Sequence, residues 1–368
     1  MSETHVAAVL EAVGQPLSLK TLPIPQAVTG SATVRVLATA LSPNSKDVFS
    51  GCFGPLGVRT PVTPSAACIG RIHSVGPDAT SLKPGQLVFT DFWTPSRDDP
   101  DNSILAGYMG GADQLEAVWN QGTFAQYASV PLERVWSLNE SLLCDSQKYT
   151  PAELVYLGNL CIAFAGLLDI NVRPGDSVIA APATGTFGGA AVHAAIALGA
   201  RVIACGRNEQ MLARMADAFG PSGRLTTVTL SGNVEIDTTA IKSAAGGKGA
   251  DKYIDFSPPR AQGTTHLVSC ISALRSNAKA SLMGTIFGNV EIPYYPLIKN
   301  NISIQGRLMF ERHHVDQVLK LLESGHLSLG NRPNSGMRIQ TFKLPDIDKA
   351  IDEAAKVRGW GEYIVIEP

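Results

Sequence analysis

The chain has 368 residues, 45% of them hydrophobic and 17% charged. This length and composition predict a globular protein with a large hydrophobic core and two domains. Its net charge of -2 gives no electrostatic reason to expect nucleic acid or an anionic membrane as a partner, and no apolar run is expected to span a bilayer. The six cysteines form no Cys-x-x-Cys pair, so we expect neither a zinc ribbon nor a disulfide framework, and a reduced, cytoplasmic setting is the simplest interpretation.

The first 150 residues predict a mostly β domain. Short β-like runs such as ATVRVLATAL and IGRIHSVG are separated by turns that contain proline or glycine. The polar, glycine-rich segment 94–122 is predicted to be a loop insertion. Loops of this length often border a functional site.

The pattern changes near Thr150. Thr150, Pro151 and Glu153 form a helix start signal: a capping hydroxyl, a proline in the first turn and the acid of a capping box. Strand-like and helix-like segments then alternate to about residue 300, which favours a parallel sheet with crossover helices. The predicted fold class is therefore α/β, with a doubly wound parallel-sheet domain over residues 151–299.

The stretch 178–208, VIAAPATGTFGGAAVHAAIALGARVIACGRN, predicts a strand, a turn of small residues and a helix over Gly189–Leu198. In such a turn Gly185 lets the backbone approach a pyrophosphate, and Gly188 lets the helix pack closely on the strand. The helix N-terminus offers N–H groups to the phosphates. Ala183 replaces the first glycine of the GxGxxG fingerprint. The stretch predicts dinucleotide binding, the alternative being a tight turn without a ligand.

The second strand ends in Gly206-Arg207-Asn208, without the acid that usually holds the ribose 2′-hydroxyl of NAD. Gly206 leaves room and the guanidinium of Arg207 suits a 2′-phosphate, so NADPH is the predicted cofactor. Alternatively, Arg207 is a solvated turn residue. Later strand ends at 255–257 and 283–285 are expected to border the same crevice. The predicted cofactor-binding residues are Ala183, Thr184, Gly185, Thr186, Phe187, Gly188, Gly206, Arg207, Asn208, Ser257 and Gly284.

The order Pro-Gly-Asp (174–176), strand, ATGTFGG, helix and LGARVIACGRN resembles the medium-chain dehydrogenase/reductase superfamily over nearly the whole chain. The resemblance implies a GroES-like β domain, formed by residues 1–150 and completed by 300–368, and a Rossmann domain over 151–299. Relatives commonly form homodimers by pairing the edge strands of their Rossmann sheets. The segment 288–306, GNVEIPYYPLIKNNISIQG, could supply that strand here, and a monomer is the alternative.

Zinc alcohol dehydrogenases of this superfamily hold a catalytic zinc with Cys, His and Cys. Alignment of their motifs places Ser42 at the first cysteine, Ala66 at the histidine and Gly158 near the third ligand, with Cys161 three residues away. These side chains cannot hold zinc, and the four-cysteine lobe is absent, so no metal is predicted. The chain instead resembles the zinc-free branch of quinone oxidoreductases and enone or enoyl reductases. Its SPNSKDVFSG stretch (42–51) is similar to that branch's NPxDxxxxxG, with Ser42 in place of asparagine.

Reduction of a plain ketone places negative charge directly on oxygen, which zinc enzymes offset with a Lewis acid. A conjugated acceptor spreads that charge to a remote carbonyl oxygen, where hydrogen-bond donors suffice. We therefore predict NADPH-dependent hydride transfer to an activated C=C or a quinone, with Ser42, Asn44 and Tyr108 as candidate catalytic residues. Turn chemistry for Ser42 and Asn44, and a loop role for Tyr108, are the alternatives. Two other functions stay open: a zinc-free alcohol or ketone dehydrogenase, and a non-catalytic NADPH-binding protein.

Overall fold

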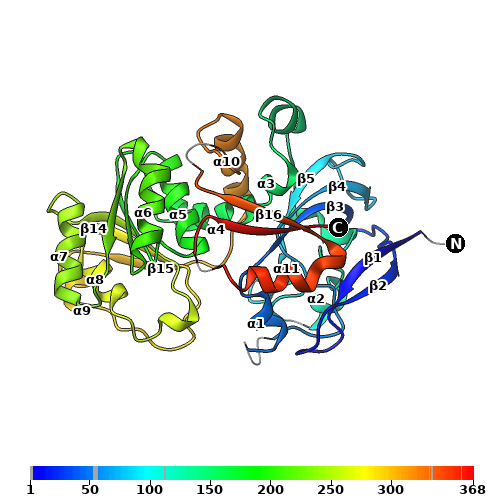
Figure 1. Cartoon of the computed structure of the whole chain (residues 1–368), viewed down its shortest axis with the longest axis horizontal. Helices are drawn as coiled ribbons and strands as arrows, with labels where there is room; N and C mark the ends of the chain where they lie inside the picture. Colours follow the sequence, from blue (N-terminus) through cyan, green and yellow to red (C-terminus); the bar gives the residue numbers. More distant parts are fainter. Residues whose placement is uncertain (1–2, 53–56, 112, 331, 333–334, 358) are drawn as a thin grey trace. The chain divides into compact units, whose positions relative to one another are not determined.

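The computed structural model describes residues 3–52, 57–111, 113–330, 332, 335–357 and 359–368 (Figure 1). The chain folds into two compact units. Unit 1 comprises residues 1–158, 338–358 and 362–368, and unit 2 comprises residues 159–337 and 359–361. The chain therefore leaves unit 1, builds unit 2 and returns to unit 1 near its C-terminus.

Unit 1 is a mostly β domain. Its largest sheet runs in the order β16-β17-β3-β4-β5-β9, with β8 also paired to β3, and two hairpins, β1-β2 and β6-β7, accompany it. The strands are β1 (Thr4–Val9), β2 (Ser18–Pro23), β3 (Ser31–Leu41), β4 (Cys68–Val75), β5 (Leu87–Thr90), β6 (Trp93–Pro95), β7 (Ser103–Leu105), β8 (Tyr127–Pro131), β9 (Val135–Ser137), β16 (Arg338–Lys343) and β17 (Glu362–Glu367). The helices are α1 (Ser45–Phe49), α2 (Asp113–Val118), α3 (Pro151–Leu154) and α11 (Ile347–Ala354).

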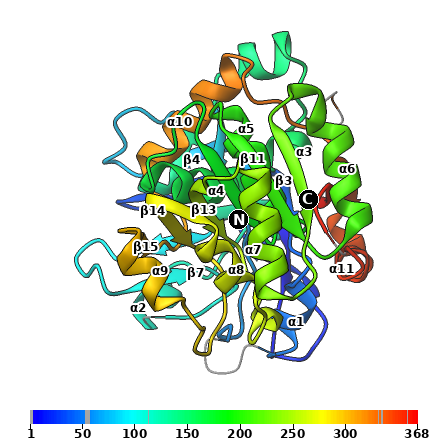
Figure 2. The ribbon, with the colours of Figure 1, turned by 90° about the vertical axis from the view of Figure 1, so that its left-hand side faces the viewer.

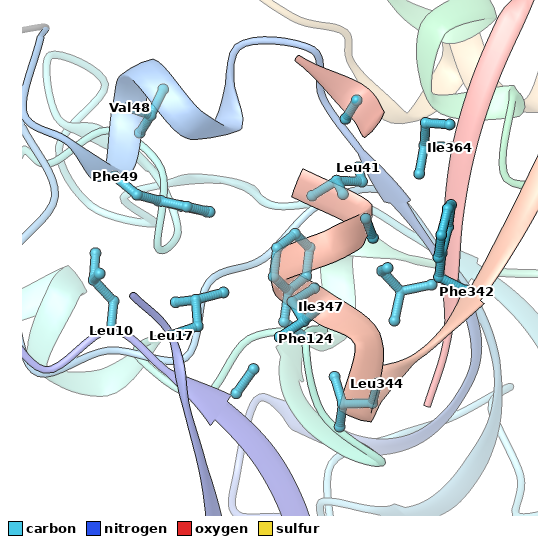
Figure 3. Close-up of a cluster of buried hydrophobic side chains, with 14 of the residues drawn as sticks. Leu10, Leu17, Leu41, Val48, Phe49, Phe124, Phe342, Leu344, Ile347 and Ile364 are labelled. Atoms are coloured by element: carbon cyan, nitrogen blue, oxygen red, sulfur yellow. The ribbon is translucent and has the colours of Figure 1, made fainter. Parts of the chain in front are cut away.

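One apolar core ties the two ends of the chain together within unit 1. Phe49 of α1 and Leu10, from the N-terminal part, share a buried cluster with Ile347 of α11 and Ile364 of β17 (Figure 3). The antiparallel pairing of β17 with β3 aligns Ile364 with Leu41. The C-terminal segment is therefore an integral part of this domain, because its apolar side chains complete the same core.

Unit 2 is a six-stranded parallel sheet in the order β12-β11-β10-β13-β14-β15. This order, 3-2-1-4-5-6, is that of a Rossmann fold. The strands are β10 (Ser177–Ala181), β11 (Arg201–Gly206), β12 (Leu225–Thr229), β13 (Ala250–Asp255), β14 (Leu274–Leu282) and β15 (Ser303–Gly306). The helices are α5 (Thr186–Ala197), α6 (Glu209–Phe219), α7 (Val234–Ala244), α8 (His266–Ser272), α9 (Tyr294–Lys299) and α10 (Arg312–Glu323), and α4 (Leu157–Asp169) enters the unit (Figure 2).

Helices α7 and α8 cover one face of this sheet, where Ile241 and Leu267 belong to the same buried cluster as Ile179 of β10 and Ile203 of β11. Helix α5 is apolar all round and is buried from Gly188 to Ile196. A helix with that composition must be buried, because no face of it suits water. The α/β prediction with a GroES-like and a Rossmann domain is confirmed.

The unit boundaries differ from the predicted ones. Unit 2 begins at Asn159 rather than 151 and continues to Met337 rather than 299, so the segment 300–337 belongs to the Rossmann unit. The reason is that β15 adds a sixth strand beside β14, with Ser303 aligned to Lys279. The predicted loop insertion 94–122 also differs, because it contains β6, β7 and the short helix α2.

Residues Pro151–Asp169 form an apolar helical segment of mean hydropathy 1.5, long enough by composition alone to cross a membrane. No apolar run of that length was expected from the sequence. In the structure 78% of its most apolar stretch is buried inside the protein, as in a core helix. The helix start is as predicted: Thr150 and Glu153 cap each other's backbone N–H groups.

Candidate functional site

The turn after β10 leads directly into the N-terminus of α5. The helix begins at Thr186, three residues earlier than predicted, because extended Gly185 serves as its N-cap and its carbonyl accepts the Gly189 N–H at 2.8 Å. Thr186, Phe187 and Gly188 therefore lie in the first helical turn rather than in a loop. The uncapped N–H groups of such a turn suit an anion.

The two glycines of this turn have different surroundings. A Cβ at Gly188 would overlap the carbonyl oxygen of Pro182, so the close approach of α5 to the preceding turn requires glycine. Gly185 is exposed, and a Cβ there would meet no described atom within 4 Å. The bare backbone at Gly185 is thus open to a ligand. The close packing predicted at Gly188 is present, and the binding role of Gly185 stays a prediction.

Gly206, at the end of β11, lies against the same turn. A Cβ at Gly206 would come within 2.7 Å of the Thr184 side chain. Arg207 is exposed, and no described residue pairs with its guanidinium. Asn208 accepts a hydrogen bond from Met211 N at 3.0 Å and caps α6, so its side chain has a structural role. The structure therefore brings Gly206 against Thr184, and exposed Arg207 follows Gly206 in the chain.

Ser257 and Gly284 follow β13 and β14, at the same carboxyl edge of the sheet. A Cβ at Gly284 would lie 2.6 Å from the Ser257 carbonyl oxygen, which also accepts the Thr285 N–H at 2.8 Å. Phe256 stacks on Phe187 of α5 with ring centroids 5.9 Å apart. All the predicted cofactor-binding residues therefore lie on segments at one edge of one sheet.

A buried polar cluster that was not predicted from the sequence follows β13. The Ser257 hydroxyl donates to Asp255 Oδ1 at 2.5 Å and lies 2.7 Å from His266 Nε2. His266 Nδ1 lies 2.7 Å from the Thr264 hydroxyl. The Tyr253 hydroxyl donates to Asp255 Oδ1 at 3.1 Å, and burial raises the pKa of Tyr253, so this phenol keeps its proton.

A second missed feature is the short segment 359–361, which belongs to unit 2 although its flanking residues do not. Trp360 N donates to the Thr184 carbonyl at 2.9 Å, and the Trp360 ring lies so close to Gly189 that no Cβ would fit there. The same ring packs against Phe219, with centroids 5.1 Å apart. The segment 359–361 therefore packs against the glycine turn at Thr184 and against the first turns of α5 at Gly189.

In unit 1, two of the three candidate catalytic residues meet. The Tyr108 hydroxyl donates to Ser42 Oγ at 3.4 Å, and burial raises the pKa of Tyr108. Asn44 is exposed at the N-cap of α1, and only its backbone N–H bonds to Ser42 Oγ, at 3.2 Å. Asn44 therefore serves the turn before α1, and its side chain makes no described contact with the Ser42–Tyr108 pair. Tyr108 also lines a cavity of about 160 Å³ within unit 1, together with Val58, Ile104 and Trp119.

The positions aligned with zinc ligands are occupied by small side chains. A Cβ at Gly158 would overlap the Cβ of Ala67, next to Ala66, so these two positions lie in direct contact. The described residues include no group of three or more His, Cys, Asp or Glu side chains arranged to hold a metal ion. The donor set at Ser42, Ala66 and Gly158 does not fit zinc, which needs nitrogen, thiolate or carboxylate ligands.

Two family models match the chain. Residues 29–140 match the alcohol dehydrogenase GroES-like domain, and residues 187–324 match the zinc-binding dehydrogenase domain. The chain belongs to the medium-chain dehydrogenase/reductase superfamily, a family of NAD(P)-dependent oxidoreductases.

The curated relatives of this chain include alcohol dehydrogenases and an enoyl reductase. An alcohol dehydrogenase of Rhizobium meliloti (strain 1021) is 24% identical over 88% of this chain and 90% of its own length. The mitochondrial enoyl-[acyl-carrier-protein] reductase of Homo sapiens is 27% identical over 55% of this chain and 46% of its own length.

Solved structures share the fold at lower identity. An alcohol dehydrogenase (rspB) from E. coli CFT073, complexed with NADH, has a TM-score of 0.78 at 18% identity and covers 99% of each chain. A zinc-binding dehydrogenase from Sinorhizobium meliloti 1021, bound to NADP, has a TM-score of 0.77 at 17% identity and covers 100% of each chain.

Proposed function

We propose that this protein is an NADPH-dependent reductase that transfers hydride to an activated C=C bond or a quinone without zinc. The observation that carries the proposal is the donor set at the zinc positions. Ser42, Ala66 and Gly158 offer no zinc ligand, and Ala67 fills the space that a side chain at position 158 would need. An acceptor whose charge delocalises needs hydrogen-bond donors rather than a Lewis acid.

The carboxyl edge of the unit 2 sheet would hold the cofactor. The first-turn N–H groups of α5 and the bare backbone at Gly185 suit the pyrophosphate. The exposed guanidinium of Arg207, beside Gly206, suits a 2′-phosphate through charge-assisted hydrogen bonds. The NADP-bound and NADH-bound relatives of the same fold support a nicotinamide cofactor. We infer the preference for NADPH from Arg207 alone.

Bound NADPH would supply the hydride. Tyr108 would then donate a hydrogen bond to the enolate or quinol oxygen in place of its present bond to Ser42 Oγ, because a phenol is protonated at neutral pH and burial raises the pKa of Tyr108 further. We expect Tyr108→Phe to lower kcat by about 10- to 100-fold while the Kd for NADPH stays unchanged. Tyr127→Phe, in the same unit, is the control. Equal kcat values for native protein and Tyr108→Phe would show that Tyr108 takes no part in the reaction.

A zinc-free alcohol or ketone dehydrogenase is the second candidate, favoured by the names of the relatives. The decisive experiment measures NADPH consumption with enones, enals, quinones, enoyl thioesters and simple ketones, and locates deuterium from 4-deuterated NADPH in the product. Turnover of enones or quinones but not of ketones supports the first proposal, and the reverse supports the second. Tight NADPH binding without turnover would indicate a non-catalytic binding protein. Stoichiometric zinc in purified active protein would contradict both zinc-free proposals.

We also propose a homodimer in the cytoplasm, without nucleic acid or membrane partners. Strand β15 is the last strand of the unit 2 sheet, and nearby Tyr294, Tyr295 and Ile298 of α9 are 75%, 67% and 56% exposed. An open strand edge beside apolar side chains favours pairing with a second copy. Light scattering on the purified protein should give twice the monomer mass, and Ile298→Asp should shift it towards the monomer. A monomer in the native protein at micromolar concentration would exclude this dimer.

A further inference from the structure

The cavity of about 160 Å³ beside Tyr108, here called the Tyr108 cavity, lies within unit 1 and is lined from the stretches 58–62, 104–110 and 113–120. Four of its lining side chains are apolar and have exposed fractions of 8% or less: Val58, Val62, Ile104 and Ala106. An apolar cavity of about 150 Å³ accommodates benzene. The Tyr108 cavity therefore has the volume and the lining for an apolar group of about six carbon atoms.

Three charged side chains also line the Tyr108 cavity. Arg59 pairs with Asp113, and its Nε lies 2.7 Å from Glu116 Oε2. The Glu116 side chain is only 13% exposed, and its Oε1 accepts the Gly111 N–H at 2.8 Å. These contacts join α2 to the stretch 58–62 and to the turn at Gly111, so the walls are held in place without a ligand. Because two carboxylates accompany one guanidinium, the lining carries a net negative charge.

Tyr108 connects this cavity to the candidate catalytic pair. Its ring is part of the cavity wall and packs edge-on against Phe92, with centroids 5.7 Å apart. Its hydroxyl, at the end of the same ring, donates to Ser42 Oγ. A molecule whose oxygen accepts from that hydroxyl therefore lies beside the Tyr108 ring, where an apolar substituent reaches the cavity.

We propose that the Tyr108 cavity holds the non-reacting substituent of the substrate, and that this substituent is apolar, uncharged and no larger than about six carbon atoms. The substrate class is then an unsaturated carbonyl compound or a quinone with one compact alkyl or cyclic group. The identity of the reacting group rests on the proposed function. The size limit follows from the volume, and the exclusion of a carboxylate on the substituent follows from the negative lining.

The first test needs neither cofactor nor turnover. Met109 lines the cavity, so its methyl signal in protein labelled with carbon-13 at the methionine methyl groups reports binding, and its loss in Met109→Leu assigns it. Cyclohexanone should shift this signal saturably. Cyclopentanecarboxamide should bind about five- to tenfold more tightly than cyclopentanecarboxylate, which has the same shape but a negative charge. No saturable shift with cyclohexanone, or equal affinities for the amide and the carboxylate, would overturn the proposal.

Two pairs of variants locate the binding. Ala117 is an exposed residue of α2 that lines the cavity, so Ala117→Phe should fill the space and abolish the cyclohexanone shift. Val118→Phe, at the next position and 59% exposed, should leave the shift unchanged. Asp113→Asn should bring the affinities of the amide and the carboxylate within about twofold of each other, whereas Asp101→Asn, at an exposed position of the same insertion, should not. A shift that persists in Ala117→Phe would place the ligand elsewhere and refute the assignment.

The second test measures NADPH consumption with a series of methyl ketone enones whose β-substituent grows from methyl to octyl. The KM should fall by about three- to fourfold for each added CH2 up to about hexyl and then stop falling, because the cavity is full, while kcat stays within about twofold. In Ala117→Phe the KM should no longer fall along the series, and the Kd for NADPH should equal that of native protein.

The two tests fail in different ways. A KM of the native enzyme that does not depend on chain length would overturn the assignment of the cavity to the substrate. Saturable binding of cyclohexanone at Met109 without turnover of any enone or quinone would instead refute the proposed function, and would leave the cavity as a site for an uncharged apolar group.

Discussion

We predict that the buried side chain of His193 makes the free energy of unfolding fall at acidic pH. It lies on α5, is 5% exposed and packs its ring against Phe219 with centroids 5.2 Å apart. Burial lowers the pKa of His193 from 6.5 to about 4, because the charged imidazolium loses its hydration there. Below pH 6.5 the imidazole of His193 therefore binds a proton in the unfolded chain but stays neutral in the folded protein until the pH approaches 4. The neutral ring makes its full contribution to the free energy of unfolding above pH 6.5, and this contribution is lost as the pH falls from 6.5 towards 4.

The size of this loss follows from the two pKa values. A difference of about 2.5 corresponds to about 3 kcal/mol once the pH lies below both values, and to about 2 kcal/mol between pH 7.5 and pH 5. Urea unfolding of native protein and of His193→Gln at these two pH values isolates the effect, because other titrating groups act equally in both proteins. His193→Gln should lose about 2 kcal/mol less than native protein, and His326→Gln should lose as much as native protein. If His193→Gln and native protein lose the same free energy, the ring is not held neutral by burial.

Three further substitutions test other parts of the structure. Arg207→Ala should raise the Kd for NADPH by about 10- to 100-fold and leave the Kd for NADH within about twofold, as fluorescence titration would show. Gly188→Ala should lower the free energy of unfolding by about 1–3 kcal/mol because its Cβ overlaps a backbone oxygen, whereas Gly185→Ala, with free space around it, should not. Arg134→Leu should cost about 3–5 kcal/mol in urea unfolding, since it leaves the buried carboxylate of Asp91, now bound by two hydrogen bonds of 2.9 and 2.6 Å, without its cation.

The parts of the fold that could be predicted are those with local signals. The capping box at Thr150, the strand over 178–181 and the helix that follows the glycine turn each depend on residues within a few positions. Strand β15 has only four residues and no strong pattern, and what holds it is pairing with β14, more than 20 residues earlier. The predicted boundary near 300 was therefore wrong, because no local signal reports that pairing.

The candidate site shows the same division. The glycine turn, Gly206 and Ser257 could be placed on one edge because parallel strands end at the same side of a sheet. His266 could not be joined to Ser257 from the sequence, since only the course of the loop before α8 brings their side chains to 2.7 Å. Trp360 contacts Gly189 across about 170 positions, and an isolated Trp between glycines predicts no such contact.

The zinc positions show what structure adds to an alignment. Alignment assigns Ser42, Ala66 and Gly158 to the zinc positions, and none of these three side chains is a zinc ligand. If Cys161 took the place of Gly158, the set would still contain one thiolate with a hydroxyl and a methyl group, whereas a catalytic zinc needs three protein ligands. The contact between Gly158 and Ala67 is independent of any alignment. Because the backbone at Gly158 approaches Ala67 too closely for a Cβ, a thiolate could enter there only if the two segments moved apart.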